Sequence, residues 1–480
     1  MLDIRHIVGA VLLFVKGLVK LIGECEDFSE LEKGVHELCQ DVCNQIFTWA
    51  LEKIDTRLMN ERDRSIWEVV GFRTKTAIST FGEFPLKRRL YRNKETGETK
   101  FFLDELLGWP ERARVTPYLK ELAIKLSTEL FFGRAAEILS YLVPKLSTMT
   151  IWHITQEAGE ILQREGEEKR AAVFEDGEAP SGKEVVRELH IEGDGVIVNL
   201  QREKEKRGEI KHIVTYEGKK QVSRNRFALQ NKLVVSTLSE GQVAWEESYA
   251  RAGGKWDLEQ IKEIYIGGDG AKWIKEGLED FPGAVYCLDP YHLNRHLTEA
   301  LWYDEETFQK VGAAISHSNW QETQAILTEA IKKTRGNRKK RLIKLLHYLE
   351  ENWTGIINSA GAKRLGTIEG QIQHNVARRM KRLGAKWTTT GGDRMARLLA
   401  AKANGELSNY ASRWPVEHGK LKEIAQIKPV EKSVEKQKAG EIGEWLQATI
   451  PALKGPFADR PWIKHVLREL TRPEFAALIC

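Results

Sequence analysis

The order of strand-like and helix-like segments after residue 188 restricts the fold of this chain more than any other feature. Three apolar, β-branched runs come first and fit an antiparallel meander. Two further runs then alternate with helical segments. The predicted strands cover 189–200, 209–216, 232–238, 263–267 and 284–288. This order predicts an α/β domain with a mixed sheet and helices on its faces.

The tripeptide Gly-Asp-Gly occurs twice in this region, each time beside β-branched residues. Asp194 lies in the first predicted strand, and Asp269 directly follows the fourth. An Asp-Gly pair usually marks a turn. However, the strand order is that of a ribonuclease-H-like domain, in which the first and fourth strands are neighbours. The two carboxylates would then lie together near the carboxyl ends of the strands, where functional groups of open sheets gather.

Two carboxylates in one cleft repel each other unless a cation joins them. Mg²⁺ prefers oxygen ligands, and a pair of such ions about 3.5–4 Å apart supports phosphodiester chemistry. Glu369 is the candidate third ligand, because helical spacing places it on one apolar stripe with Ile372 and Val376. The alternative is a first-turn glutamate that only interacts with the helix dipole. Asp393 and Glu406 are competing third acids.

A second constellation follows the fifth predicted strand. Asp289 and His292 lie three residues apart, and His296 follows one helical turn later. Together with Cys287 they permit a zinc site, but the general-base glutamate of a metalloprotease helix is absent. A histidine that assists proton transfer or binds DNA is the favoured interpretation.

The N-terminal segment could be taken for a membrane span or a metal site. The uninterrupted apolar run 7–15 is too short to cross a bilayer, and its helical spacing predicts an amphipathic helix that packs on a neighbour or a second subunit. Cys25, His36, Cys39 and Cys43 match no standard zinc spacing, which favours packed thiols. Five cysteines without a Cys-x-x-Cys pair favour a reduced, cytoplasmic setting.

Basic residues gather in segments that could contact DNA phosphates. Segment 81–103 predicts a hairpin that turns at Glu95–Gly97, and segment 117–163 has a helix-turn-helix outline. The net charge of +5 is compatible with a nucleic-acid partner. The candidate DNA-binding residues are Arg88, Arg89, Arg92, Lys339, Lys340, Arg341, Arg378 and Arg382.

At 480 residues the chain is too long for one ordinary core. A mainly helical DNA-binding region is expected to precede the α/β domain. The predicted parts are an N-terminal helical region (1–80), a hairpin and helix-turn-helix-like region (81–163), a linker (164–187), the first part of the α/β core (188–302), a helical insertion (303–360), the last helix of the core (361–400) and a tail (401–480).

Four ordered segments resemble the ISLre-type bacterial insertion-sequence transposases, a family distantly similar to the Mutator-like transposases. These segments read HIEGDGVIV, YIGGDGAKWI, CLDPYHLNRHL and IEGQIQHNVARRMKRLGAKWT. The resemblance covers residues 80–400 and implies a DDE transposase with a ribonuclease-H-like catalytic domain. It assigns Asp194, Asp269 and Glu369 as the metal-binding acids. Asp289 and His292 match the short Asp-x-x-His element of the Mutator-like relatives.

The resemblance implies Mg²⁺-dependent hydrolysis at the ends of a mobile element, with Mn²⁺ as a possible substitute, followed by attack of the freed 3′-OH on target DNA. The implied partner is double-stranded DNA, held by at least a dimer, with no membrane contact. A ribonuclease-H-like nuclease without strand transfer and a catalytically lapsed DNA-binding relative are the alternatives. A zinc hydrolase built on Asp289, His292 and His296 is a third.

Overall fold

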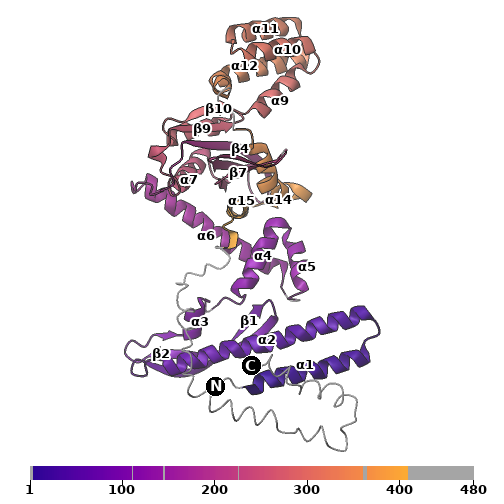
Figure 1. The fold of residues 1–480 in the computed structure, drawn as a ribbon, viewed down its shortest axis with the longest axis vertical. Helices are drawn as coiled ribbons and strands as arrows, with labels where there is room; N and C mark the ends of the chain where they lie inside the picture. Colours follow the sequence, from indigo (N-terminus) through magenta and orange to yellow (C-terminus); the bar gives the residue numbers. More distant parts are fainter. Residues whose placement is uncertain (1–3, 111, 144–145, 225, 360–364, 409–480) are drawn as a thin grey trace, which may run out of the picture. The chain divides into compact units, whose positions relative to one another are not determined.

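A computed structural model describes residues 4–110, 112–143, 146–224, 226–359 and 365–408 (Figure 1). All of these lie in the first of two compact units, Met1–Val416. The predicted tail, 401–480, lies outside the described residues from position 409 onwards.

The N-terminal part combines a helical hairpin with a small sheet. Its elements are α1 (Ile4–Glu24), α2 (Phe28–Glu61), β1 (Trp67–Ser79), β2 (Gly82–Asn93), β3 (Thr99–Lys100) and α3 (Phe102–Leu107). Helices α1 and α2 lie side by side (Figure 1). The prediction of a helical region over 1–80 missed β1, which is rich in β-branched and aromatic residues. The predicted turn at Glu95–Gly97 is confirmed, since it joins β2 to the short antiparallel strand β3. A second turn at residues 80–81, which joins β1 to β2, was not predicted.

Three helices lead from this sheet to the α/β domain. They are α4 (Pro117–Glu129), α5 (Phe132–Ser140) and α6 (Thr148–Phe174). Ser147 caps α6, because its side chain accepts the N–H of Thr150 at 3.1 Å. Helix α6 continues eleven residues into the segment predicted as a linker from 164 onwards, and Gly166 is buried there. The glycine is required, since a Cβ atom would lie 2.7 Å from a carboxylate oxygen of Glu247.

The central sheet is mixed, with the strand order β10-β9-β4-β5-β8. The strands are β4 (Glu188–Leu200), β5 (Arg207–Tyr216), β8 (Leu233–Thr237), β9 (Glu263–Gly268) and β10 (Val285–Leu288). Strands β4, β5 and β8 run antiparallel, whereas β9 and β10 run parallel to β4. The predicted α/β fold with a mixed sheet is confirmed, as is the pairing of the first strand with the fourth. A hairpin of β6 (Gly218–Ser223) and β7 (Arg226–Gln230) was not predicted.

The pleat of β4 separates two cores. Ile191 points to the face covered by α7 (Gly241–Gly253) and α8 (Lys272–Asp280), where it joins a cluster with Trp245 and Ile274. Val196 points to the opposite face and packs in a second cluster with Val376. Because each fully buried side chain of this size stabilises the fold by about 1.5–3 kcal/mol, the two clusters fix the register of β4.

The segment predicted as a helical insertion consists of helices. After α9 (Pro290–Leu301) come α10 (Glu305–Ser316), α11 (Trp320–Lys333) and α12 (Gly336–Ser359). These three helices lie side by side (Figure 1). The single helix predicted around Glu369 is instead three short pieces: α13 (Ile368–Ile372), a π-helical turn (Gln373–Ala377) and α14 (Arg378–Met380). Strand β11 (Lys386–Trp387) then pairs with the end of β4, and α15 (Thr389–Ala403) follows.

A buried ion network joins α15 to the sheet and to α7. Arg397 donates to both carboxylate oxygens of Glu247, at 2.8 and 2.7 Å, and to Asp393 at 2.8 Å. Asp393 also accepts the hydroxyl of Thr237 at 2.6 Å and the backbone N–H of Leu238 at 2.8 Å. Every charge in this network therefore has a partner, as burial demands.

Removing Glu247 should destabilise the fold severely. Glu247→Ala leaves the buried guanidinium of Arg397 without its bidentate partner, which costs about 3–5 kcal/mol. Urea unfolding would show this as a large drop in the midpoint. Glu306→Ala is the matched control, because the Glu306–Lys310 pair on α10 is exposed, and its midpoint should stay near that of the wild type. Equal midpoints for the two variants would contradict a structural role of the network.

His212 should make the fold sensitive to mild acid. Complete burial, aided by the charge of Lys232, lowers its pKa from about 6.5 to about 3, so the folded protein holds the imidazole neutral. The neutral imidazole of His212 contributes fully to the free energy of unfolding above pH 6.5. This contribution falls by about 1.4 kcal/mol per pH unit as the pH drops towards 3. Urea unfolding at pH 7.5 and 5.5 should show a smaller pH-dependent loss in His212→Gln than in the wild type. An equal loss would contradict this assignment.

Candidate functional site

The register of the parallel strands sets the two glycine-flanked aspartates side by side. In the β4–β9 pair, Glu192 lies opposite Gly267. Two residues further along both strands, Asp194 is level with Asp269, which directly follows the end of β9. Both positions are on the same face of the sheet as Glu192, because side chains alternate along a strand.

The neighbouring strand β10 adds a third aspartate at the same level. Leu288 pairs with Gly268, so Asp289 follows at the height of Asp269, and it caps the start of α9. The carboxylate of Asp289 lies 2.7 Å from Nδ1 of His292. Both side chains are buried. Because a carboxylate can only accept, Nδ1 of His292 carries the proton of this hydrogen bond. The other ring nitrogen, Nε2, is then available to contact a bound ion or substrate.

The hydrogen bond that His292 donates to Asp289 raises the pKa of His292. Burial opposes this shift, and the negative charges of Asp194, Asp289 and Asp269 add to it. The imidazolium form of His292 is therefore favoured by its surroundings.

Glu369 lies beside this edge of the sheet, although not in the expected way. Ile368 and Ile372 are the buried positions of α13, and Glu369 itself is exposed. The predicted stripe assumed a regular helix through Val376, whereas α13 ends at Ile372 and passes into a π-helical turn. Ile368 and Ile372, four residues apart, both face the core, so Glu369 lies at the edge of the core-facing side of the helix.

Among the described residues, one group of acid or histidine side chains is close enough to hold a metal ion. It consists of Asp194, His292 and Glu369, whose potential ligand atoms all lie within 4.8 Å of one another. Burial raises the pKa of Asp194 to about 6, against the hydrogen bond from the N–H of Gly195. The charges of Asp269 and Glu369 raise it further, and that of His292 lowers it. The concentration of negative charge makes this edge suited to a cation.

Asp269 is not a member of that group. Its carboxylate accepts the backbone N–H of Ala271 at 2.8 Å, which holds it at the start of the turn into α8. Its backbone carbonyl accepts the hydroxyl of Tyr348 at 2.8 Å, so helix α12 contacts the site directly. Of the three predicted acids, the structure thus brings Asp194 and Glu369 together, adds His292, and places Asp269 level with Asp194.

The zinc alternative finds no support in this part of the molecule. The ring of His296 packs against Tyr348 with a centroid separation of 4.1 Å. Cys287 is buried in β10, and burial raises the pKa of its thiol to about 11. Neither residue belongs to the group that includes His292.

The competing third acids are occupied elsewhere. Asp393 is a member of the buried network around Arg397. Glu406 forms an ion pair with Arg251 at 2.8 Å. In the part of the chain that is described, no metal-binding group includes the N-terminal candidates Cys25, His36, Cys39 and Cys43.

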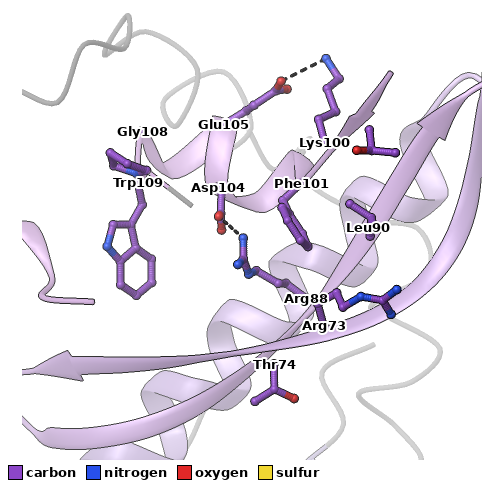
Figure 2. Close-up of a pocket in the computed structure, with 12 residues that line it drawn as sticks. Arg73, Thr74, Arg88, Leu90, Lys100, Phe101, Asp104, Glu105, Gly108 and Trp109 are labelled. Atoms are coloured by element: carbon purple, nitrogen blue, oxygen red, sulfur yellow. Dashed lines mark hydrogen bonds and ion pairs between the residues drawn. The ribbon is translucent and has the colours of Figure 1, made fainter. Parts of the chain in front are cut away.

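Two arginines of the basic hairpin are structural, contrary to the prediction of DNA contact. Arg88 is buried, forms an ion pair with Asp104 and lies over the ring of Phe101 at 3.7 Å (Figure 2). Arg89 donates to Asp55 of α2 at 2.5 Å. Both guanidinium groups are therefore committed to neighbouring elements and are not available to a phosphate.

The remaining candidate DNA-binding residues face solvent. Arg92 is exposed and pairs with Glu68 at 2.7 Å. The other exposed side chains are Lys339, Lys340 and Arg341 on α12, and Arg378 and Arg382 beyond Glu369.

Glu192 is a buried acid that sequence reasoning missed. Its carboxylate accepts the hydroxyl of Tyr216 at 2.6 Å and backbone N–H groups at the start of α13. The available signal was its place in β4, two residues before Asp194 and therefore on the same face. A carboxylate there needs several donors.

None of the described helices is long and apolar enough to cross a membrane.

Relatives of the chain occur in two bacteria. A UPF0236 protein of Caldanaerobacter subterraneus subsp. tengcongensis is 27% identical over 422 residues, covering 86% of each chain. The "UPF0236 protein in vanSb 3' region" of Streptococcus gallolyticus is 26% identical over 405 residues, covering 82% of this chain and 86% of the relative. Another Caldanaerobacter relative, 27% identical over 405 residues and covering 83% of this chain and 81% of its own, has a name that joins eleven locus designations.

The uncharacterised protein family UPF0236 matches residues 21–416. Since this match spans most of the 480 residues, the chain belongs to the UPF0236 family.

Proposed function

We propose that this protein is a DDE-type DNA transposase that cleaves the ends of an insertion sequence and joins them to target DNA. The observation that carries the proposal is the group of Asp194, Glu369 and His292, within 4.8 Å of one another, beside Asp269. The order β10-β9-β4-β5-β8 supports a ribonuclease-H-like core, since it has three antiparallel strands followed by two strands parallel to the first.

The residues of the group fit Mg²⁺ or Mn²⁺. Carboxylate oxygens of Asp194 and Glu369 are hard ligands, and a neutral ring nitrogen of His292 would suit Mn²⁺ better than Mg²⁺. Asp269 lies level with Asp194 and would add negative charge beside the ion. The raised pKa of Asp194 shows that buried negative charge lacks compensation at this point, which a divalent ion would relieve. Such ions would activate the attacking oxygen and stabilise the leaving oxygen of the phosphodiester.

The chain's own groups have separate tasks in the proposed reaction. Asp194 and Glu369 would hold the ions that bind the reacting phosphate. Asp289 accepts the Nδ1–H of His292 and thereby orients the ring, which leaves Nε2 of the neutral form to bind an ion. The glycines beside Asp269 allow close packing within the protein, because a Cβ atom would lie 2.7 Å from Ile274 at Gly268 and 2.7 Å from Asn352 at Gly270.

Exposed cations support a DNA partner. Lys339, Lys340 and Arg341 lie on α12, the helix whose Tyr348 contacts Asp269. Arg378 and Arg382 follow α13, which bears Glu369. Phosphate contacts by these two groups would position a duplex without reading its sequence.

The name that joins eleven locus designations in one Caldanaerobacter relative also favours a mobile element, because a sequence that inserts copies of itself accumulates at many loci. A reaction that joins two element ends further calls for at least a dimer, in which each copy holds one end.

Substitution of the acids should abolish cleavage and spare DNA binding. On DNA carrying the element's own ends, Asp194→Asn, Asp269→Asn and Glu369→Gln should each lower Mg²⁺-dependent nicking by more than about 100-fold, since loss of even an outer partner of a metal ligand costs about 10–100-fold. Glu306→Gln, on exposed α10, is the control and should cleave normally.

The products of the wild-type reaction separate the alternatives. Released 3′-OH ends that join to target DNA support the transposase. Cleavage without joining would indicate a nuclease of the same fold, and tight binding without cleavage would indicate a lapsed DNA-binding relative. Undiminished nicking by all three acid variants would overturn the site.

A further inference from the structure

We propose that Glu192 is a positioning residue, which fixes the start of α13 and thereby sets where the carboxylate of Glu369 lies relative to Asp194. The inference rests on the proposed function only in taking Glu369 and Asp194 as partners in metal binding. Glu192 is 1% exposed and lies in the middle of the sheet, on the face that carries Asp194.

The carboxylate of Glu192 collects the donors at the start of α13. One oxygen accepts the backbone N–H groups of Gly366 and Thr367, both at 2.8 Å, and that of Ile368 at 3.3 Å. The other accepts the hydroxyl groups of Tyr216, at 2.6 Å, and of Thr367. Both oxygens are therefore used, and the donors come from two separate parts of the chain.

These contacts replace the usual helix cap. The first N–H groups of a helix have no partner within the helix. Thr367 occupies the N-cap position of α13, yet its side chain makes no capping hydrogen bond. Glu192 provides the acceptor from β4 instead, and its negative charge suits the positive end of the helix.

The preceding residues show that the backbone is shaped for this approach. Gly366 has a φ of +95°, a conformation that other residues rarely adopt. The carbonyl of Leu365 accepts Nζ of Lys219 at 3.1 Å, which holds the same segment from the β6 side. The segment that enters α13 is thus fixed at two consecutive points before the helix starts.

Glu192 affects the candidate site because the backbone that it binds lies next to Glu369. Glu369 is the residue directly after Ile368, the last backbone N–H that Glu192 binds. Because Glu369 lies in the first turn of the helical segment that continues from α13 to Met380, the contacts that fix this first turn also fix the backbone of Glu369. Strand β4 therefore supplies one ligand directly, through Asp194, and places a second through Glu192.

The test compares metal affinity with stability in the full-length protein. Glu192→Gln keeps the size of the side chain but replaces one acceptor oxygen by an amide NH2 group, which is itself a donor and cannot accept the N–H and O–H groups around it. We expect the apparent Kd for Mn²⁺, measured by calorimetry on the protein alone, to rise about 10–100-fold, the range seen for outer partners of metal ligands. DNA binding should stay unchanged. A purely structural role would lower the unfolding midpoint and leave the Kd for Mn²⁺ unaltered, which would overturn the proposal.

Tyr216→Phe and Asp194→Asn complete the design. If Glu192→Gln does not fold, Tyr216→Phe is the deciding variant, since it removes one hydrogen bond of the Glu192 carboxylate without a change of charge. The Kd for Mn²⁺ should then rise, by less than about 10-fold. An unaltered Kd would overturn the proposal. Asp194→Asn separates the two hypotheses. If it leaves Mn²⁺ binding intact, the metal site itself is wrong; if it abolishes binding while folded Glu192→Gln does not weaken it, only the positioning role is wrong.

Discussion

Strand β4 has to bury the two carboxylates of Glu192 and Asp194 on one face, and much of the surrounding structure follows from this constraint. Burying an ionised carboxylate without partners costs several kcal/mol. Glu192 is compensated within the chain by backbone and hydroxyl donors. Asp194 receives one backbone N–H and the charge of His292, and its pKa remains raised. The two acids therefore differ in how far donors within the chain compensate their charge, and the proposed cation site lies at the less compensated one.

Elsewhere the chain neutralises its buried charges with partners that are distant in sequence. Arg397 of α15 is held by Glu247 of α7, and Arg89 of β2 by Asp55 of α2. Such pairs contribute less stability than their number suggests, because desolvation offsets much of the attraction. They do fix which elements contact each other, since a misplaced element would leave a buried charge alone. The candidate metal group of Asp194, His292 and Glu369 contains no lysine or arginine, and His292 is its one basic member.

The sequence was sufficient for the sheet and for most of the candidate site, but not for the partners of individual side chains. Strands β4, β5, β8, β9 and β10 are recognisable because each is a compact β-branched run. Asp194 and Asp269 follow from their places in two of these strands. The exposure of Glu369 was missed because a π-helical turn changes the helical phase, and no residue pattern signals that turn. Arg88 and Arg89 looked like phosphate ligands, since Asp104 and Asp55 are acceptors that only the folded chain brings near.

The histidine of the candidate site can be understood from the same balance of charges. Asp289 alone would be a further buried acid beside Asp194 and Asp269, and it would add to the repulsion. Its contact with Nδ1 of His292 offsets part of this cost, orients the ring and raises the pKa of His292. That ring then favours the ionised form of Asp194. A cluster with three aspartates and one glutamate is therefore tolerable in the folded chain because one acid is neutralised internally by His292, a second is tied to a backbone N–H, and Glu369 stays at the solvent border. What remains is the negative charge of Asp194 and Glu369, and a divalent cation is the partner whose charge matches it.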